Sequence, residues 1–188
     1  MSKTESRYPT TVGILPVRRG VLLPGTSMSI PVGRPRSVAL IETIKAGDVI
    51  GVTAQRDPDT EDPVLTDLHD VGTFAKVTKV QRTRDGRTFR IVVEGLARFE
   101  LGGLVQTEPS WIARVTATPD PDPTEEAKLL AAEIRTNLSR MSGSANPGLS
   151  EILAADPEPG ELGDRVASGL DVERDREIEV LRTGDVPT

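Results

Sequence analysis

The segment Pro119-Asp-Pro-Asp-Pro123 divides this chain of 188 residues into two parts. Proline fixes φ and has no amide hydrogen, so alternating prolines propagate neither a helix nor a strand ladder. We therefore predict a linker over residues 119–123. The two parts differ in charge, because residues 1–118 carry a net charge of +3 and residues 119–188 a net charge of −9. We expect them to be built differently.

The part before the linker has the pattern of β structure. Its apolar side chains recur with a period of two, or in short Val/Ile runs that end at Gly, Pro or Asp. About seven short strands indicate a small barrel or a pair of packed sheets. One helix interrupts them, beginning at Pro35 and ending near Gly47, which is placed to act as a left-handed cap. The predicted fold class is therefore α+β. The strands are expected at residues 12–17, 27–32, 49–55, 72–80, 88–94, 99–104 and 111–117.

Two local features refine this β part. Pro31 lies within a predicted strand but has no amide donor, so that strand is expected at an edge or a bulge. The Asp85-Gly86 pair predicts a hairpin with a type I′ turn, because both central residues tolerate positive φ.

The part after the linker reads as helical. Thr124 is a suitable N-cap, and apolar side chains then follow at helical spacing to about Met141. Helices this short are marginal alone in water, so they must pack on one another or on the β part. We assign residues 124–188 to a helical subdomain, with shorter helices at residues 150–155, 161–170 and 172–183.

The composition excludes several kinds of catalytic site. Cysteine is absent, and the only histidine is His69. Thiolate metal sites, disulfides and a cysteine nucleophile are therefore ruled out, and a lone histidine is more often structural than catalytic. No phosphate-binding loop or dinucleotide fingerprint occurs. We predict no catalytic residue, no metal site and no cofactor in this chain.

The N-terminal sequence lacks the apolar core of a signal peptide, and no stretch approaches the roughly 20 apolar residues of a membrane helix. We therefore predict a cytoplasmic protein with no membrane contact. Residues 1–11 are predicted to be disordered.

The run Gly20-Val-Leu-Leu-Pro-Gly25 is apolar and flanked by glycines. If it is exposed, it offers a surface suited to unfolded polypeptide. If it is buried, it closes one end of the barrel, which is the arrangement we favour for most of its side chains.

The predicted hairpin is rich in lysine and arginine, with Asp85 as its one opposing charge. A basic strip through Arg84, Arg87 and Arg90 could contact RNA or an acidic protein. The alternative, which we favour, is that alternate hairpin positions face solvent and are charged for solubility. Only five aromatic residues are present, so platforms for stacking bases are scarce.

An ordered set of short motifs occupies residues 14–118. The motifs are Leu15-Pro-Val-Arg-Arg-Gly-Val-Leu-Leu-Pro-Gly25, Pro31-Val-Gly-Arg34 with Ser37 and Glu42, Gln55 with Pro63, Asp67-Leu68 with Val71-Gly72-Thr73, Asp85-Gly86, and Val93-Glu-Gly-Leu-Ala-Arg-Phe99. This ordered set resembles the amino-terminal domain of Lon, the ATP-dependent protease. The helical stretch 124–183 resembles the region that follows this domain in the family.

This resemblance implies a PUA-like β-barrel over residues 12–118 followed by a helical bundle, in a bacterial cytoplasmic protein. It also implies recognition of unfolded, damaged or degron-bearing proteins, and hexamers in the full enzyme. The ATPase module, which needs ATP and Mg²⁺, and the Ser-Lys protease module are absent from this chain. We therefore expect a non-catalytic fragment of the enzyme that ends before the ATPase module.

The first hypothesis for function is substrate recognition through apolar surface. The alternative is a stand-alone adaptor that binds a protein partner or RNA through Arg84, Arg87 and Arg90, although nucleic acid is not expected as a partner. The residues assigned to substrate binding under the first hypothesis are Leu22, Leu23, Pro24 and Met28, with Leu96 and Phe99 in second rank.

Overall fold

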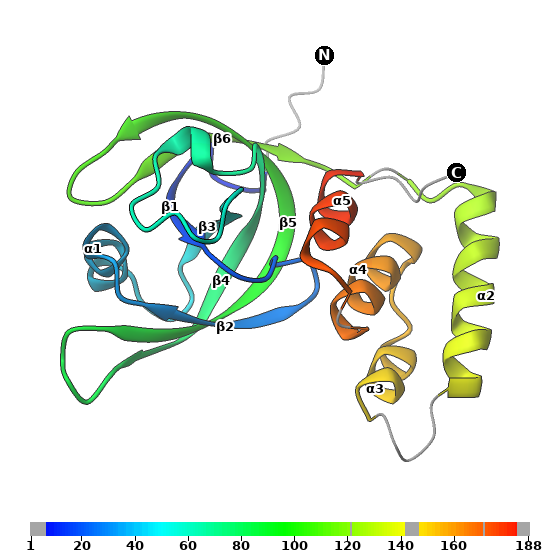
Figure 1. The fold of residues 1–188 in the computed structure, drawn as a ribbon. Coiled ribbons are helices and arrows are strands. Elements are labelled where there is room, and N and C mark those ends of the chain that lie inside the picture. The colour runs from blue at the N-terminus through cyan, green and yellow to red at the C-terminus, as the bar shows by residue number, and fades with distance from the viewer. Residues whose placement is uncertain (1–6, 121, 142–146, 171, 184–188) are drawn as a thin grey trace.

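The computed structural model describes residues 7–120, 122–141, 147–170 and 172–183. A curved sheet with one helix forms the first part, and four helices form the second (Figure 1). The first part comprises β1 (Thr11–Val17), β2 (Ser27–Val32), α1 (Pro35–Thr43), β3 (Val49–Ala54), the short 3-10 helix η1 (Leu65–Asp67), β4 (Val71–Arg82), β5 (Phe89–Gln106) and β6 (Ile112–Thr118). The second comprises α2 (Glu125–Met141), α3 (Pro147–Ala155), α4 (Pro159–Gly169) and α5 (Arg174–Thr183).

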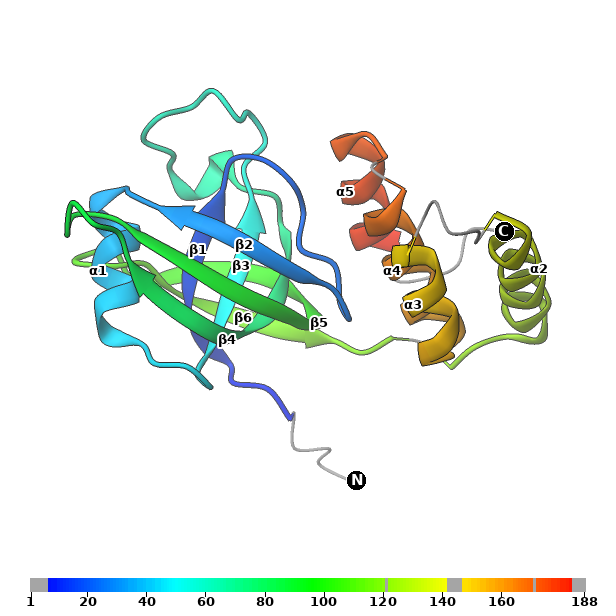
Figure 2. The ribbon, with the colours of Figure 1, turned by 90° about the horizontal axis from the view of Figure 1, so that it is seen from below.

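The six strands form one sheet in the order β2-β5-β4-β3-β1-β6, and β6 also pairs with β5. The sheet therefore curls, as Figure 2 shows. β1 and β3 are parallel, and the other pairs are antiparallel. The α+β class is confirmed. The strands form one six-stranded sheet rather than the closed barrel that was predicted: β6 pairs with both β1 and β5, whereas β2 pairs with β5 alone and leaves the sheet open between β1 and β2.

Six strands replace the seven expected, because residues 88–94 and 99–104 belong to one continuous strand, β5. Gly95 lies inside β5 rather than ending it. Its amide donates to the Thr26 carbonyl oxygen at 2.8 Å, and its carbonyl oxygen accepts from the Gly25 amide at 3.0 Å. A Cβ here would lie 2.3 Å from the Leu23 carbonyl oxygen, so glycine is needed for this close crossing of two backbones.

Pro31 lies in β2, which is an edge strand, as predicted. The prediction of a type I′ turn at Asp85-Gly86 is wrong. Gly86 has φ of +70°, but Asp85 is not among the described residues with positive φ. The Asp85 carboxylate instead accepts from the Arg87 amide at 3.0 Å and from the Thr83 hydroxyl. Side-chain bonds thus hold a wider loop in which only glycine is left-handed.

Two buried clusters fill the curved sheet. The larger joins the sheet to α1 and includes Ile178 and Leu181 from α5. The smaller surrounds Phe74 and Phe99, whose ring centroids lie 5.0 Å apart. Tyr8 stacks on Phe74 at 4.8 Å, and β1 begins at Thr11. The predicted disorder of residues 1–11 is therefore wrong for residues 7–11, because this aromatic contact holds the start of the chain. Residues 1–6 lie outside the described residues.

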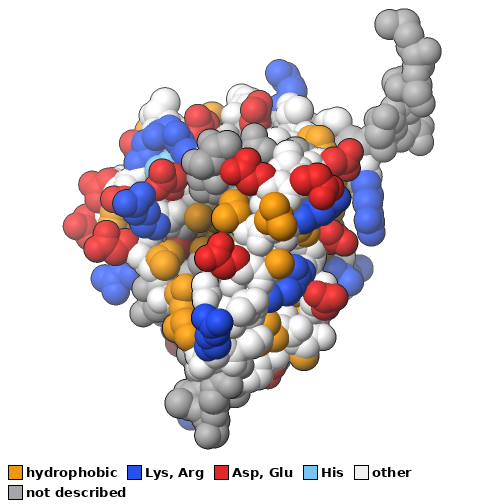
Figure 3. All heavy atoms as spheres, turned by 90° about the vertical axis from the view of Figure 1, so that its right-hand side faces the viewer, with side chains coloured by type: hydrophobic (Ala, Val, Ile, Leu, Met, Phe, Trp, Pro, Cys, Tyr) orange, Lys and Arg blue, Asp and Glu red, His pale blue; other side chains and the backbone are white. Residues whose placement is uncertain are grey.

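The helices follow the predicted order with shifted ends. The Thr124 hydroxyl accepts from the Ala127 amide at 3.1 Å, which is the expected N-cap, and α2 ends at Met141. The predicted bundle is not formed, because the short helices share only a small core. Their outer face mixes apolar side chains with both charges (Figure 3). The shared core consists of Ala131, Leu138, Ile152 and Leu162.

Among the described residues, no helix has the length and the apolar character needed to span a membrane.

Arg98 of β5 connects the helices to the sheet. Its Nε donates to the Leu181 carbonyl oxygen at 3.1 Å, and its Nη1 bonds Asp120 at 3.0 Å. Its Nη2 donates to the Asp164 carboxylate of α4 at 2.5 Å and to the Val180 carbonyl oxygen at 3.4 Å. Arg98 is 5% and Asp164 2% exposed, so the ion pair is buried. One cation thereby satisfies acceptors from α4, α5 and the segment before α2.

Asp164 gives the stability of the protein a distinct pH dependence. Burial raises the pKa of this carboxyl from 3.8 to about 6, with Asp120 and Glu161 acting in the same direction and Arg98 against it. Between pH 3.8 and about 6, the carboxyl of Asp164 is protonated in the folded chain and ionised in the unfolded chain. The free energy of unfolding due to this group therefore falls as pH rises from about 4 to 6, by at most about 1.4 kcal/mol per pH unit.

The measurement is urea unfolding across this pH range for the wild type and for Asp164→Asn, which cannot titrate. The difference in unfolding free energy, wild type minus variant, is expected to decrease as pH rises. A difference that increases would show that the bond to Arg98 outweighs the cost of burial.

Candidate functional site

A groove of about 440 Å³ lies between β1 and β2, where the sheet is open. Residues 15–19 form one wall and residues 28–34 the other, with Ser37 of α1 at one end. We call it the β1–β2 groove. The β2 wall is an edge strand, and such an edge offers unpaired main-chain donors and acceptors to a ligand. The opening between β1 and β2 therefore leaves room for an extended chain beside β2.

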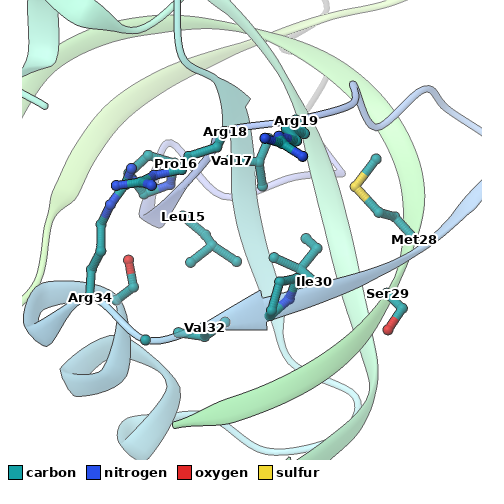
Figure 4. A pocket seen from close by; sticks show the side chains of 13 residues that line it. Leu15, Pro16, Val17, Arg18, Arg19, Met28, Ser29, Ile30, Val32 and Arg34 are labelled. Carbon is teal, nitrogen blue, oxygen red and sulfur yellow. The ribbon is translucent and has the colours of Figure 1, made fainter. Parts of the chain in front are cut away.

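The floor of the groove is apolar. Leu15 faces Ile30 and Val32 from the opposite wall, and all three side chains are buried (Figure 4). Met28 is half-buried and lies toward one end, whereas Arg34 lies toward the other. Methionine is flexible and polarizable, so it adapts to apolar side chains of different shape. Above the buried floor, the apolar surface that a ligand can reach belongs to the half-buried Pro16 and Met28 and the exposed Pro31.

The rim of the groove is cationic. It contains Arg18, Arg19 and Arg34, and no carboxylate lines it. Nη2 of Arg34 donates to Gln55 Oε1 at 2.6 Å and to the Thr60 carbonyl oxygen at 3.3 Å, which fixes its position. Burial and then Arg18 lower the pKa of the Arg34 guanidinium, while Asp62 raises it. The positive charge on this rim is therefore only partly compensated.

A second pocket of about 390 Å³ adjoins the groove and is lined by charges of both signs. Arg36 forms ion pairs with Asp62 at 3.3 Å and Glu108 at 3.1 Å. Its guanidinium carbon lies 5.6 Å from the centroid of the Trp111 ring, within range of a cation–π contact. These contacts already satisfy Arg36, in contrast to the rim of the groove. The residues that line both pockets are Pro16, Arg34 and Ser37.

Most residues predicted to bind substrate lie in the core. Leu23 and Phe99 are fully buried, and Leu22 is 2% exposed. The Leu22 carbonyl oxygen also accepts from the buried Thr73 hydroxyl at 2.6 Å. The run from Gly20 to Gly25 is thus packed inside, the arrangement we favoured, and these side chains cannot reach a ligand in this conformation. Leu22, Leu23, Pro24 and Phe99 are buried, whereas Met28 and Leu96 are half-buried, and substrate contact by these two stays a prediction.

The basic strip lies along the hairpin of β4 and β5. Arg84, Arg87 and Arg90 are all exposed. Arg90 Nη1 donates to the Ser29 hydroxyl at 3.5 Å, and Ser29 lines the groove. Arg84 and Arg87 lie in the hairpin loop and do not line the groove. Of the three arginines, Arg90 is the one that bonds a residue of the groove.

Three groove residues escaped prediction as site residues. Arg18, Arg19 and Arg34 were noted only within longer motifs. The Arg-Arg pair at the end of an apolar strand was the available signal. It became meaningful only once β2 was placed opposite β1.

No group of three or more His, Cys, Asp or Glu that could hold a metal ion occurs among the described residues. His69 is half-buried beside a cluster of arginines. Burial, then Arg56, Arg182 and Arg174, lower the pKa of its imidazole, while Asp70 raises it. The ring is therefore held neutral near pH 7.

Comparison with protein families places the chain among known sequences. The family model for the substrate-binding domain of ATP-dependent protease La (LON) matches residues 11–188. Lon protease 4 of Sorangium cellulosum is 50% identical over 182 residues, which is 96% of this chain and 22% of that protein. Lon protease of Anaeromyxobacter dehalogenans is 35% identical, covering 93% of this chain and 21% of that protein. The chain thus spans about a fifth of the length of these curated relatives.

Two solved structures share the fold. The N-terminal domain of Mycobacterium avium complex Lon protease aligns with a TM-score of 0.69 and 19% identity, covering 94% of this chain and 91% of that one. A Lon N-terminal domain protein from Xanthomonas campestris aligns with a TM-score of 0.62 and 20% identity, covering 94% and 92%.

Proposed function

Because the chain belongs to the family of ATP-dependent protease La (LON) substrate-binding domains, we propose that it binds protein substrates of a Lon-type protease through the β1–β2 groove. The observation that carries this proposal is the opening between β1 and β2, with an apolar floor beside an edge strand. Unfolded or damaged proteins expose apolar side chains on extended backbone. These are the two features that such a groove can contact at once.

The proposed role is non-catalytic. The domain would hold unfolded, damaged or degron-bearing proteins in the cytoplasm and deliver them to ATPase and Ser-Lys protease modules outside this chain. A single shallow groove binds weakly. Six copies in a hexameric enzyme would raise the effective concentration of a captured chain without a tight individual site.

Replacing Met28 by serine is expected to weaken binding of an unfolded protein about tenfold, which corresponds to ~1.4 kcal/mol. The reason is that Met28 supplies the half-buried apolar surface at one end of the groove. The measurement is fluorescence anisotropy of the chain with a reduced, unfolded model protein, with the native form of that protein as the negative control.

Leu129→Ser is the matched control, because Leu129 is an apolar residue of α2 that is 72% exposed and lies outside the groove. It is expected to leave binding unchanged. Equal losses in both variants would contradict the groove as the site. Binding that depends instead on Arg84, Arg87 and Arg90 and disappears in salt would support the adaptor alternative, which the family match does not favour.

A further inference from the structure

We propose that the β1–β2 groove prefers segments in which an acidic side chain lies next to an apolar one. This inference rests on the proposed function and adds a charge preference to it. It follows from three observations: the arginines of the rim form no ion pair, apolar surface lies beside them, and in the neighbouring pocket an arginine is paired with two carboxylates.

The cations of the rim form no ion pair with any described residue. Arg18 and Arg19 are exposed, and neither forms an ion pair with any described residue. Arg34 donates to neutral oxygens of Gln55 and Thr60 rather than to a carboxylate. Its guanidinium is half-buried beside Arg18, so it gains most from an incoming negative charge.

The adjoining pocket provides an internal comparison. Arg36 there bonds both Asp62 and Glu108, and its pocket carries carboxylates as well as a cation. The β1–β2 groove shares a wall with this pocket but has three arginines and no carboxylate. A ligand carboxylate in the groove would pair with an arginine of the rim, as Asp62 and Glu108 pair with Arg36 in the adjoining pocket.

The apolar floor decides what must accompany the charge. Pro16, Met28 and Pro31 supply the accessible apolar surface above the buried floor, with Arg34 at one end of the groove. A ligand that covers this surface with an apolar side chain brings its neighbouring residues to the cationic rim. An extended segment with alternating apolar and acidic side chains satisfies both surfaces, because its side chains alternate in direction. The occupant we commit to is such a segment of a substrate protein.

The probes are two unstructured synthetic peptides of equal length, one with Leu-Asp pairs and the other with Leu-Asn pairs. The Asp peptide is expected to bind the full chain about tenfold more tightly at low salt, and this advantage is expected to shrink as salt rises. Binding of the Asn peptide through its leucines is expected to depend little on salt.

The decisive variants remove equal charge at different places. Arg18→Ser with Arg19→Ser is expected to reduce the tenfold ratio of the two dissociation constants to about two- to threefold, because Arg34 remains. Arg84→Ser with Arg87→Ser changes the net charge equally at the hairpin loop and is expected to keep the tenfold ratio. Circular dichroism shows whether both variants fold, which is expected since all four side chains are exposed.

Three outcomes would overturn the inference. Equal affinity of wild type for both peptides would refute the acidic preference while leaving the proposed function intact, because the Asn peptide still binds. Equal losses in the two double variants would show a general field effect. A wild-type dimer that dissociates on loss of Arg18 and Arg19, measured by sedimentation, would identify a second copy as the occupant. If neither the peptides nor unfolded protein bind, it is the proposed function that fails.

Discussion

Replacing Arg98 by alanine is expected to separate α4 and α5 from the sheet, at a cost of about 3–5 kcal/mol. The side chain is buried and bonds Asp164 together with the carbonyl oxygens of Val180 and Leu181. Its loss leaves a buried carboxylate and main-chain acceptors without donors. Hydrogen exchange measured by mass spectrometry should show α4 and α5 losing protection while β3 and β4 keep theirs.

The matched control is Arg182→Ala. Arg182 of α5 forms an ion pair with Asp70, and this pair also joins the helices to the first part of the chain. Both side chains are well exposed, so the expected cost is only about 0–1 kcal/mol. The double variant Arg98→Met with Asp164→Leu is expected to recover much of the lost stability, because it removes both buried charges together. Unchanged exchange in Arg98→Ala would mean that apolar contacts alone hold the helices.

Replacing Phe99 by alanine is expected to lower the free energy of unfolding by about 3–5 kcal/mol. Phe99 has no exposed surface, contacts the Phe74 ring, and lies where Gly51 and Gly72 leave room for its edge. A cavity in this position cannot refill easily, since the surrounding backbone belongs to three strands of the sheet. Urea unfolding at fixed pH measures the loss.

This prediction also separates a core role from a binding role, because Phe99 was first assigned to substrate. Phe99→Leu keeps most of the buried volume and is expected to fold and to bind unfolded protein as the wild type does. A folded Phe99→Leu variant with weakened binding would restore Phe99 to the site. Met28→Ser is expected to show the reverse pattern, with nearly normal stability and weakened binding.

Local signals in the sequence were sufficient for most elements. Thr124 marked the start of α2, and Pro31 marked an edge strand, because each depends on hydrogen bonds within a few residues. The prediction of two strands on either side of Gly95 was wrong, because glycine in a strand signals either the end of the strand or a close crossing of two backbones. Only the position of Leu23 decides between these two cases. The prediction of a type I′ turn was wrong because Asp85 does not adopt positive φ, and its carboxylate accepts a hydrogen bond from the Arg87 amide instead.

The site was harder to predict than the fold. Exposure of Leu22 or Phe99 cannot be read from the pattern, because a glycine-flanked apolar run looks the same inside and outside. The groove depends on which strands fail to pair, and pairing joins residues far apart in the chain. Arg98 lay within a motif that resembled the family, yet nothing local showed that its partner would be Asp164, 66 residues later.

β5, with 18 residues, is the longest of the six strands and pairs with β2, β4 and β6. One of its ends supports the wall of the groove through β2, and Arg98, farther along the same strand, holds the helices. A mechanical load applied to α5 would therefore enter β5 directly, through the side chain of Arg98, as well as along the backbone of residues 119–123. Because these two connections act in parallel, we expect a force applied to the helices to be transmitted through β5 to the groove before residues 119–123 are fully extended.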